Sequence, residues 1–333
     1  MLKPGKLPIE FLEYLLKKYA FKDSRIVIGP GIGKDAAVID IGNKYLVAKT
    51  DPVTLASKEM GWYLVNINAN DISCMGAKPK WFLATLLLPQ KGTTKKSIEG
   101  IFATVSKACG KLGIALCGGH CEVTRGIDQP IIVGAMFGEV EKEKLVRGNA
   151  RPGDSIILTK GIAIEGTAII SNEKEESLKK KFSSSFIKKA KKYLYNPGIS
   201  VVKEANLANS IPGVHYMHDP TEEGLVTGLY EVAKACDVGL IVDEEKIIIL
   251  PESEALCNEF GLDPMGTIAS GALIIVCNHR NTQRVVRTLV KNRIYATAIG
   301  KITEKKYGVK IKKRDDILYN LKIFPQDEIT KIY

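Results

Sequence analysis

A tight β-hairpin is the feature that most constrains the fold of this chain. Two short apolar runs, 36–41 and 44–50, are separated by Gly42-Asn43, which is a two-residue signal for a hairpin turn. If these two residues form the turn, position 41 faces 44, 40 faces 45, and the pairing continues outward. Asp35 then lies opposite Thr50, at about 5 Å. The hairpin therefore predicts which polar side chains meet at its open end.

A second carboxylate and a glycine-rich loop flank this open end. Asp51 follows Thr50, so two carboxylates meet there, and their repulsion costs free energy unless a cation or hydrogen-bond donors offset it. The loop 29–34, which includes Gly33 and Lys34, precedes Asp35 and can bring backbone N–H groups close to an anion. Its spacing is not that of a Walker loop, and taken alone it is better explained as an ordinary glycine turn.

A third carboxylate falls on the apolar side of a predicted helix. Residues 60–75 have helical periodicity, and Asp71 shares a face with apolar residues one turn apart. A buried carboxylate is costly unless it is paired or binds a metal. Asn66 and Asn70 add polar groups near the same end. The alternative is a solvent-facing aspartate, but three carboxylates within 37 residues favour a common function.

Paired glycines follow a predicted strand, 113–117. Gly118 and Gly119 at the end of this strand would let the backbone approach a ligand, and His120 or Glu122 would then contact metal or substrate. A tight turn that carries a surface histidine explains the same segment equally well.

Asp219 opens another predicted helix. With Pro220 at the first helical position and Glu222 at the third, Asp219 has the pattern of an N-cap, which needs no functional role. An aspartate at a helix start can also hold a divalent cation that bridges phosphates. The loops 263–266 and 269–271 form a comparable second element, and each element taken alone favours a structural role.

Strand and helix patterns alternate along the whole chain, with hairpins among them, which predicts an α+β fold. At 333 residues the chain is long enough for two domains, and the turn 151–154 is a plausible boundary.

The net charge is +11, but the runs 172–195 and 301–316 carry +5 and +4 of it. We interpret the first run as a solvated lysine-rich helix, so a nucleic-acid partner is not expected.

No run approaches the roughly 18 apolar residues that a membrane helix needs, and 8–19 predicts an amphipathic helix instead of a signal peptide. We therefore expect a cytoplasmic protein without a membrane partner. The seven cysteines are scattered and odd in number, which does not indicate a disulfide framework.

Six segments, in the same order from about Leu7 to Lys310, resemble the ATP-binding superfamily of aminoimidazole ribonucleotide (AIR) synthetase. They are Asp35–Val38, Thr50–Pro52, Asn70–Pro79, Gly118–Glu122, Asp219–Leu225 and Asp263–Gly271. This superfamily includes thiamine-monophosphate kinase, selenophosphate synthetase and the hydrogenase-maturation protein HypE. The segments at Asp219 and Asp263 look most like HypE and its unassigned relatives.

The resemblance implies an N-terminal domain, 1–150, whose strands pair across a homodimer into a β-barrel, and a C-terminal α/β domain, 151–333. It also implies ATP and Mg²⁺ as cofactors, with Asp35, Asp51, Asp71 and Asp219 as metal ligands. The residues expected to be catalytic are Asp51, Asp71 and His120. Those expected to bind the nucleotide are Gly33, Lys34, Asp35, Thr50, Asn70, Gly118, Gly119, Glu122, Asp219 and Thr221. The implied reaction moves the terminal phosphoryl group of ATP to an amide-like oxygen of a small molecule or a peptide.

The sequence departs from this family pattern at several positions. Lys34 stands where many relatives have a second aspartate, His120 where several have an acid, and Glu223 where a glycine is common. HypE acts through a cysteine at its carboxyl terminus, whereas the last cysteine here is Cys277. Two alternatives therefore remain: a HypE-type maturation factor, and a dimeric nucleotide-binding scaffold without turnover.

Overall fold

The structure is a computed structural model that describes residues 7–21 and 23–333. Its residue contacts divide the chain into two compact units. The six-stranded unit contains residues 24–28 and 35–145. The seven-stranded unit contains residues 7–21, 23, 29–34 and 146–333. Both combine helices with a mainly antiparallel sheet, which confirms the predicted α+β class. The domain limits 1–150 and 151–333 stay a prediction.

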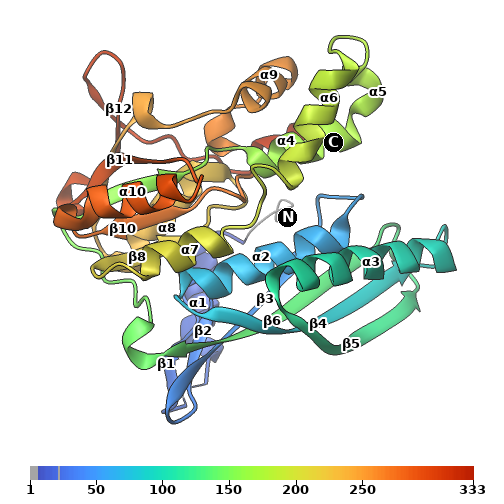
Figure 1. Ribbon diagram of the computed structural model, residues 1–333, viewed down its shortest axis with the longest axis horizontal. Helices are drawn as coiled ribbons and strands as arrows, with labels where there is room; N and C mark the ends of the chain where they lie inside the picture. The colour runs from blue at the N-terminus through green and yellow to red at the C-terminus, as the bar shows by residue number, and fades with distance from the viewer. Residues whose placement is uncertain (1–6, 22) are drawn as a thin grey trace. The chain divides into compact units, whose positions relative to one another are not determined.

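The six-stranded unit has one sheet and two helices, which lie in layers (Figure 1). Along the sheet the order is β1-β2-β3-β6-β4-β5. The strands are β1 (Ile26–Ile28), β2 (Ala37–Asp40), β3 (Lys44–Val53), β4 (Lys78–Pro89), β5 (Ala115–Thr124) and β6 (Ile131–Glu141). Helix α2 (Met60–Cys74) lies against β3, β6 and β4, and α3 (Lys95–Leu112) packs on α2.

The predicted hairpin is confirmed in type and register. Strand β2 pairs antiparallel with β3, with Asp40 opposite Tyr45 and Ala37 opposite Ala48. Asp35 lies just before β2 and is buried. Strand β3 continues through Thr50 to Val53 because β6 pairs with it along its whole length.

Strand β5 is longer than predicted. The expected strand end at 117 is wrong, because Gly118 and Gly119 continue the pairing with β4, opposite Leu83 and Ala84. Gly119 has φ +145°, and a Cβ atom there would come within 1.9 Å of the Ala84 carbonyl oxygen. The glycine therefore allows close strand approach instead of ending the strand.

Helix α2 matches its predicted range but not its predicted amphipathic pattern. Every residue from Met60 to Cys74 except Ile67 is buried, since the sheet covers one side of the helix and α3 another. Asp71 is therefore buried, and the solvent-facing alternative is wrong.

The seven-stranded unit is built on the strand order β13-β12-β9-β11-β7-β10-β8. Its strands are β7 (Ser155–Thr159), β8 (Val214–His218), β9 (Gly239–Asp243), β10 (Ile274–Cys277), β11 (Ala296–Thr303), β12 (Val309–Lys312) and β13 (Leu318–Asn320). Its helices of eight or more residues are α1 (Ile9–Tyr19), α4 (Ile164–Glu173), α6 (Ser184–Lys191), α7 (Val202–Asn209), α8 (Gly224–Cys236), α9 (Pro251–Phe260) and α10 (Thr282–Lys291).

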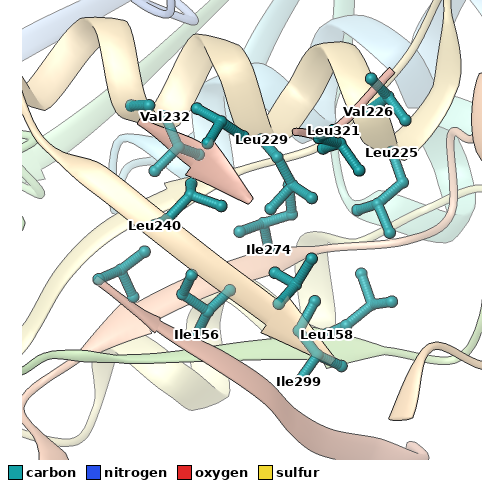
Figure 2. Close-up of a cluster of buried hydrophobic side chains, with 14 of the residues drawn as sticks. Ile156, Leu158, Leu225, Val226, Leu229, Val232, Leu240, Ile274, Ile299 and Leu321 are labelled. Atoms are coloured by element: carbon teal, nitrogen blue, oxygen red, sulfur yellow. The ribbon is translucent and has the colours of Figure 1, made fainter. Parts of the chain in front are cut away.

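The core of this unit lies between α8 and the sheet. Figure 2 shows Leu225, Leu229 and Val232 of α8 above Ile156 of β7 and Ile274 of β10. All five side chains are buried. Burial of this kind contributes about 1.5–3 kcal/mol for each large aliphatic side chain, so the cluster fixes α8 on the sheet.

Two predicted helices differ from the structure. The lysine-rich run contains short helices, α5 (Glu175–Leu178) and α6, because Ser183 begins a new helix by accepting a hydrogen bond from Phe186 N. Helix α8 begins at Gly224 and not at Asp219, and its N-cap is Glu223 in the left-handed region. None of the helices in residues 7–21 and 23–333 is both long and apolar enough to cross a membrane.

Candidate functional site

A lysine ammonium group lies between two of the three predicted aspartates in the six-stranded unit. Lys49 Nζ is 3.2 Å from Asp51 Oδ2 and 3.2 Å from Asp71 Oδ2. Burial lowers the pKa of Lys49, but the charges of Asp71, Asp51 and Asp35 outweigh this effect and raise the pKa well above its usual range. The structure therefore places the carboxylates of Asp51 and Asp71 against one ammonium group, and the charge of Asp35 acts on the same lysine.

The alternation of β3 explains why these charges meet. Tyr45 and Val47 point toward the helices and are buried, and Lys49 and Asp51 continue the same face of the strand. Asp71 approaches from the last turns of α2. Lys49 was missed by the sequence analysis, although its position in step with Tyr45 and Val47 was a usable signal.

Asn68 of α2 holds the backbone of Asp51 through two hydrogen bonds. The Asp51 N–H donates to Asn68 Oδ1 at 3.0 Å, and Asn68 Nδ2 donates to the Asp51 carbonyl oxygen at 3.3 Å. Gly134 of β6 faces Asp51, and a Cβ atom there would come 2.6 Å from Asn68 Nδ2. Asn68 was also missed, although a polar residue between Asn66 and Asn70 was its signal.

Thr50 and Asn70 occupy different surroundings. Thr50 is exposed, and its hydroxyl donates to the Gly134 carbonyl oxygen at 2.7 Å. Asn70 is fully buried in α2, as is Asn66, whose side chain donates to the Trp62 carbonyl oxygen. Their predicted contact with a nucleotide stays a prediction.

The predicted residues on β5 lie away from the aspartates within one chain. Two strands separate β5 from β3 in the sheet, which corresponds to about 14 Å at the usual strand spacing. His120 Nε2 is 3.1 Å from Glu122 Oε2, and Thr124 donates to Glu122 Oε1 at 2.6 Å. The bonds from Thr124 and His120 lower the pKa of the Glu122 carboxyl.

A pocket of about 360 Å³ lies beside these β5 residues. Leu116, Gly118, Gly119, His120 and Cys121 line its β5 side, and apolar side chains of β4 and α3 line the remainder. The pocket can hold an apolar group next to the exposed His120–Glu122 pair.

Gly33 and Lys34 belong to the seven-stranded unit. Gly33 has φ +66°, and its carbonyl oxygen accepts a hydrogen bond from the Tyr216 hydroxyl at 2.5 Å. A Cβ atom at Gly33 would come 2.5 Å from the Glu231 carbonyl oxygen of α8. The glycine is therefore required for this loop to lie on α8.

Asp219 and Thr221 lie in the turn between β8 and α8, in the same unit. Asp219 is only 1% exposed. The Thr221 carbonyl oxygen accepts hydrogen bonds from Gly224 N and Ala269 N, both at 3.1 Å. Asp219 is not the helix N-cap that the sequence predicted, because this bonded turn separates it from the first residue of α8.

Two buried carboxyls of this unit were missed by the sequence analysis. Asp327 accepts hydrogen bonds from the backbone N–H groups of Glu223, Ile268 and Ile329. Burial, opposed by a hydrogen bond from Ser270 and aided by the charge of Asp327, raises the pKa of Glu165 to about 8. Asp327 caps the short helix Glu328–Ile332 through Ile329 N, a local signal, but its bonds to Glu223 and Ile268 come from segments far away along the chain.

Comparison with known proteins assigns the chain to a family. Residues 33–140 match the N-terminal domain of AIR synthase related proteins, and residues 151–312 match the C-terminal domain. The chain belongs to the AIR synthase-related family. The family resemblance seen in the sequence is thus confirmed.

This AIR synthase-related chain is similar in sequence to three proteins whose names point to hydrogenase maturation or to a kinase. It is 27% identical to a putative hydrogenase expression/formation protein of Methanocaldococcus jannaschii, over 90% of this chain and 89% of that protein. It is 30% identical to the carbamoyl dehydratase HypE of Cupriavidus necator, over 68% of this chain and 62% of that protein. It is 28% identical to the thiamine-monophosphate kinase of Pyrococcus horikoshii, over 66% of this chain and 69% of that protein.

Solved structures show the same fold. HypE in a HypE–HypF complex superposes with a TM-score of 0.76 at 20% identity, over 94% of this chain and 99% of that chain. HypE in complex with ATP superposes with a TM-score of 0.73 at 21% identity, over 96% of each chain.

The donor atoms of the AIR synthase-related chain suit Mg²⁺, which prefers carboxylate and other hard oxygen ligands. Within residues 7–21 and 23–333, no three His, Cys, Asp or Glu side chains are grouped so as to hold one metal ion. Mg²⁺ usually takes one or two carboxylates and completes its shell with water and substrate phosphates. Asp51 and Asp71 are therefore the residues that would hold an ion arriving with a nucleotide.

Proposed function

We propose that this chain is an ATP-dependent enzyme that transfers the terminal phosphoryl group of ATP to an amide-like oxygen of its substrate. The observation that carries the proposal is the pair of carboxylates, Asp51 and Asp71, that share the Lys49 ammonium group, with the charge of Asp35 acting on the same lysine. Phosphoryl transfer depends mainly on positioning and on charge stabilisation, which such a group supplies. Family relatives named as a carbamoyl dehydratase and as a kinase, and a HypE structure with ATP, support the same class.

In this proposal the aspartates bind the cation and His120 takes part in catalysis. Asp51, whose backbone is held by Asn68, and Asp71, which lies on α2, would bind the cation that accompanies the triphosphate. Such a cation would neutralise phosphate charge. Asp35 adds negative potential to the same place. His120 is proposed as a third catalytic group, and its pairing with Glu122 orients the imidazole ring.

The remaining predicted nucleotide contacts belong to this proposal as well. Asp219 and Thr221 are proposed to contribute from the seven-stranded unit, as are Gly33 and Lys34. Asp219 is also proposed as a further ligand of the cation. A homodimer is proposed because the family resemblance implies a barrel built across two copies.

Calorimetric titration with ATP, with and without Mg²⁺, tests the nucleotide site. We expect binding that requires Mg²⁺, and we expect Asp51→Asn and Asp71→Asn each to weaken it at least tenfold while the protein stays folded. Lys44→Met, which changes an ion pair elsewhere on β3, is the matched control and keeps wild-type affinity. Unchanged affinity in both aspartate variants would remove the site assignment.

A maturation role is the second candidate function. It is favoured by the similarity to the hydrogenase expression/formation protein of M. jannaschii, which extends over 89% of that protein. The proposed acceptor is then a peptide-borne amide instead of a small molecule. ADP formation measured with carbamoylated peptides and with thiamine monophosphate separates these acceptors, because transfer to either one leaves ADP. ATP binding without ADP formation for any acceptor would instead support a scaffold without turnover.

A further inference from the structure

Lys49 occupies the place where a bound cation would act on the aspartates. Its ammonium group contacts Oδ2 of Asp51 and Oδ2 of Asp71 at the same distance, 3.2 Å. The Asp71 side chain is 7% exposed, so its charge would be costly without a partner. Lys49 thus stabilises the folded chain before any metal or nucleotide arrives.

Because Lys49 contacts both carboxylates, it would compete with a divalent ion for Asp51 and Asp71. A divalent ion that binds Asp51 and Asp71 would share their carboxylates with Lys49, which contacts Oδ2 of each, and two cations at one pair of carboxylates repel each other. The Lys49 side chain is 23% exposed, so part of it reaches solvent. Its flexible four-carbon stem allows the ammonium to move without a change in β3.

We propose that Lys49 is the resident counter-ion of the aspartate group and must be displaced by the divalent cation that arrives with the nucleotide. The proposal rests on the proposed function, because it concerns the same aspartates. It adds a residue that sets the affinity for the ion: free Mg²⁺ binds weakly, whereas Mg²⁺ with a triphosphate binds well because the phosphates offer the displaced ammonium a new partner.

Mg²⁺ alone, without nucleotide, is the probe for this competition. We expect Lys49→Met to melt at a lower temperature than wild type in EDTA, because Asp71 loses the ammonium group that offsets its charge, and to regain stability as Mg²⁺ is added. Calorimetry should show that Lys49→Met binds Mg²⁺ at least tenfold more tightly than wild type. The double variant Lys49→Met with Asp51→Asn should lose this gain.

Two further variants keep the test decisive. Lys49→Arg preserves the charge and should fold; since a guanidinium can bridge both carboxylates, it should bind Mg²⁺ no more tightly than wild type. Lys44→Met is the matched control, because Lys44 also pairs with two carboxylates, Glu139 and Glu141, on the same strand. It should leave Mg²⁺ affinity unchanged.

The outcomes separate this proposal from the proposed function. If Lys49→Met binds Mg²⁺ no more tightly than wild type, or if Lys44→Met gains as much, Lys49 is not the counter-ion, whatever ATP does. If Lys49→Met does not fold, Mg²⁺ binding to Lys49→Arg that exceeds wild type still overturns the proposal. If wild type does not bind ATP while the Lys49 variants behave as expected, only the nucleotide assignment fails.

Discussion

Asn68 and Asp51 are joined by a reciprocal pair of hydrogen bonds between a side-chain amide on α2 and the backbone of β3, at 3.0 and 3.3 Å. The Asn68 side chain also donates to the Leu64 carbonyl oxygen at 2.9 Å. The amide therefore connects the buried helix to the strand at the position that carries a proposed catalytic aspartate.

Removal of this amide should cost both stability and function. For Asn68→Ala we expect a loss of about 1–3 kcal/mol in the free energy of unfolding, because the backbone groups of Asp51 lose their buried partner. Chemical denaturation measures it, and ATP affinity should fall as well. Asn66→Ala, which removes a bond only within α2, is the control. Equal loss of ATP affinity in both variants would show that the amide has no special effect on Asp51.

Gly134 should tolerate no side chain. A Cβ atom there would come 2.6 Å from Asn68 Nδ2 and 2.7 Å from Phe82 Cε2, and both neighbours are fully buried. We expect Gly134→Ala to cost about 1–3 kcal/mol, as overpacking does. Gly100 in α3 has open space around its Cα, so Gly100→Ala should instead stabilise the protein by about 0.5–1 kcal/mol. Thermal denaturation of the two variants should show opposite signs.

Glu165 should make stability fall as the pH rises. Burial raises its pKa to about 8 from the ordinary 4.5, so the folded state holds this proton more tightly than the unfolded state does. The contribution is complete below about pH 4.5 and is lost as the pH rises through about 8, with a slope of up to about 1.4 kcal/mol per pH unit.

Glu165→Gln tests this linkage because the amide cannot ionise. Its free energy of unfolding should change less than that of wild type between about pH 5 and 8, and it should exceed wild type near pH 8. Exposed Glu254→Gln serves as the control and should follow the wild-type curve. Parallel curves for wild type and Glu165→Gln would contradict the assignment.

Asp327 should stabilise the loops that flank Asp219. Its carboxyl accepts three backbone N–H groups from segments far apart in sequence, at Glu223, Ile268 and Ile329. We expect Asp327→Ala to lose about 2–4 kcal/mol, since hydrogen bonds to charged acceptors are the stronger ones. Hydrogen exchange should accelerate at the Glu223 and Ile268 amides. Asp315→Ala, at an exposed turn of the same unit, should change neither stability nor exchange there.

The predicted homodimer can be tested on β5. Leu116 is 41% exposed on this edge strand of the six-stranded sheet. If two copies meet there, light scattering should give about twice the 36.5 kDa chain mass, and Leu116→Lys should return it to the monomer value. Leu318→Lys, an exposed leucine on β13 of the other unit, is the control. A wild-type monomer at all concentrations would contradict the homodimer.

The sequence alone determined the local elements and their chemistry. The register of β2 on β3 follows from a two-residue turn, because the pairing of a hairpin depends on nearby residues. The range of α2 was also predictable, because helical periodicity is a local pattern. The carboxylates at positions 35, 51 and 71 were found from their places on these local elements. The family was predictable because six short segments keep their order along the chain.

The tertiary structure decided what local patterns do not encode. Lys49 became the partner of Asp71 only when α2 packed on β3, and Asp327 reached Glu223 across about a hundred residues of chain. Helix α8 begins at Gly224 and not at the predicted Asp219, because two hydrogen bonds hold the intervening turn. Ala269 N donates to the Thr221 carbonyl oxygen, and Glu223 N donates to the Asp327 carboxylate. Such contacts depend on which distant segments are buried together, and burial is a property of the whole fold.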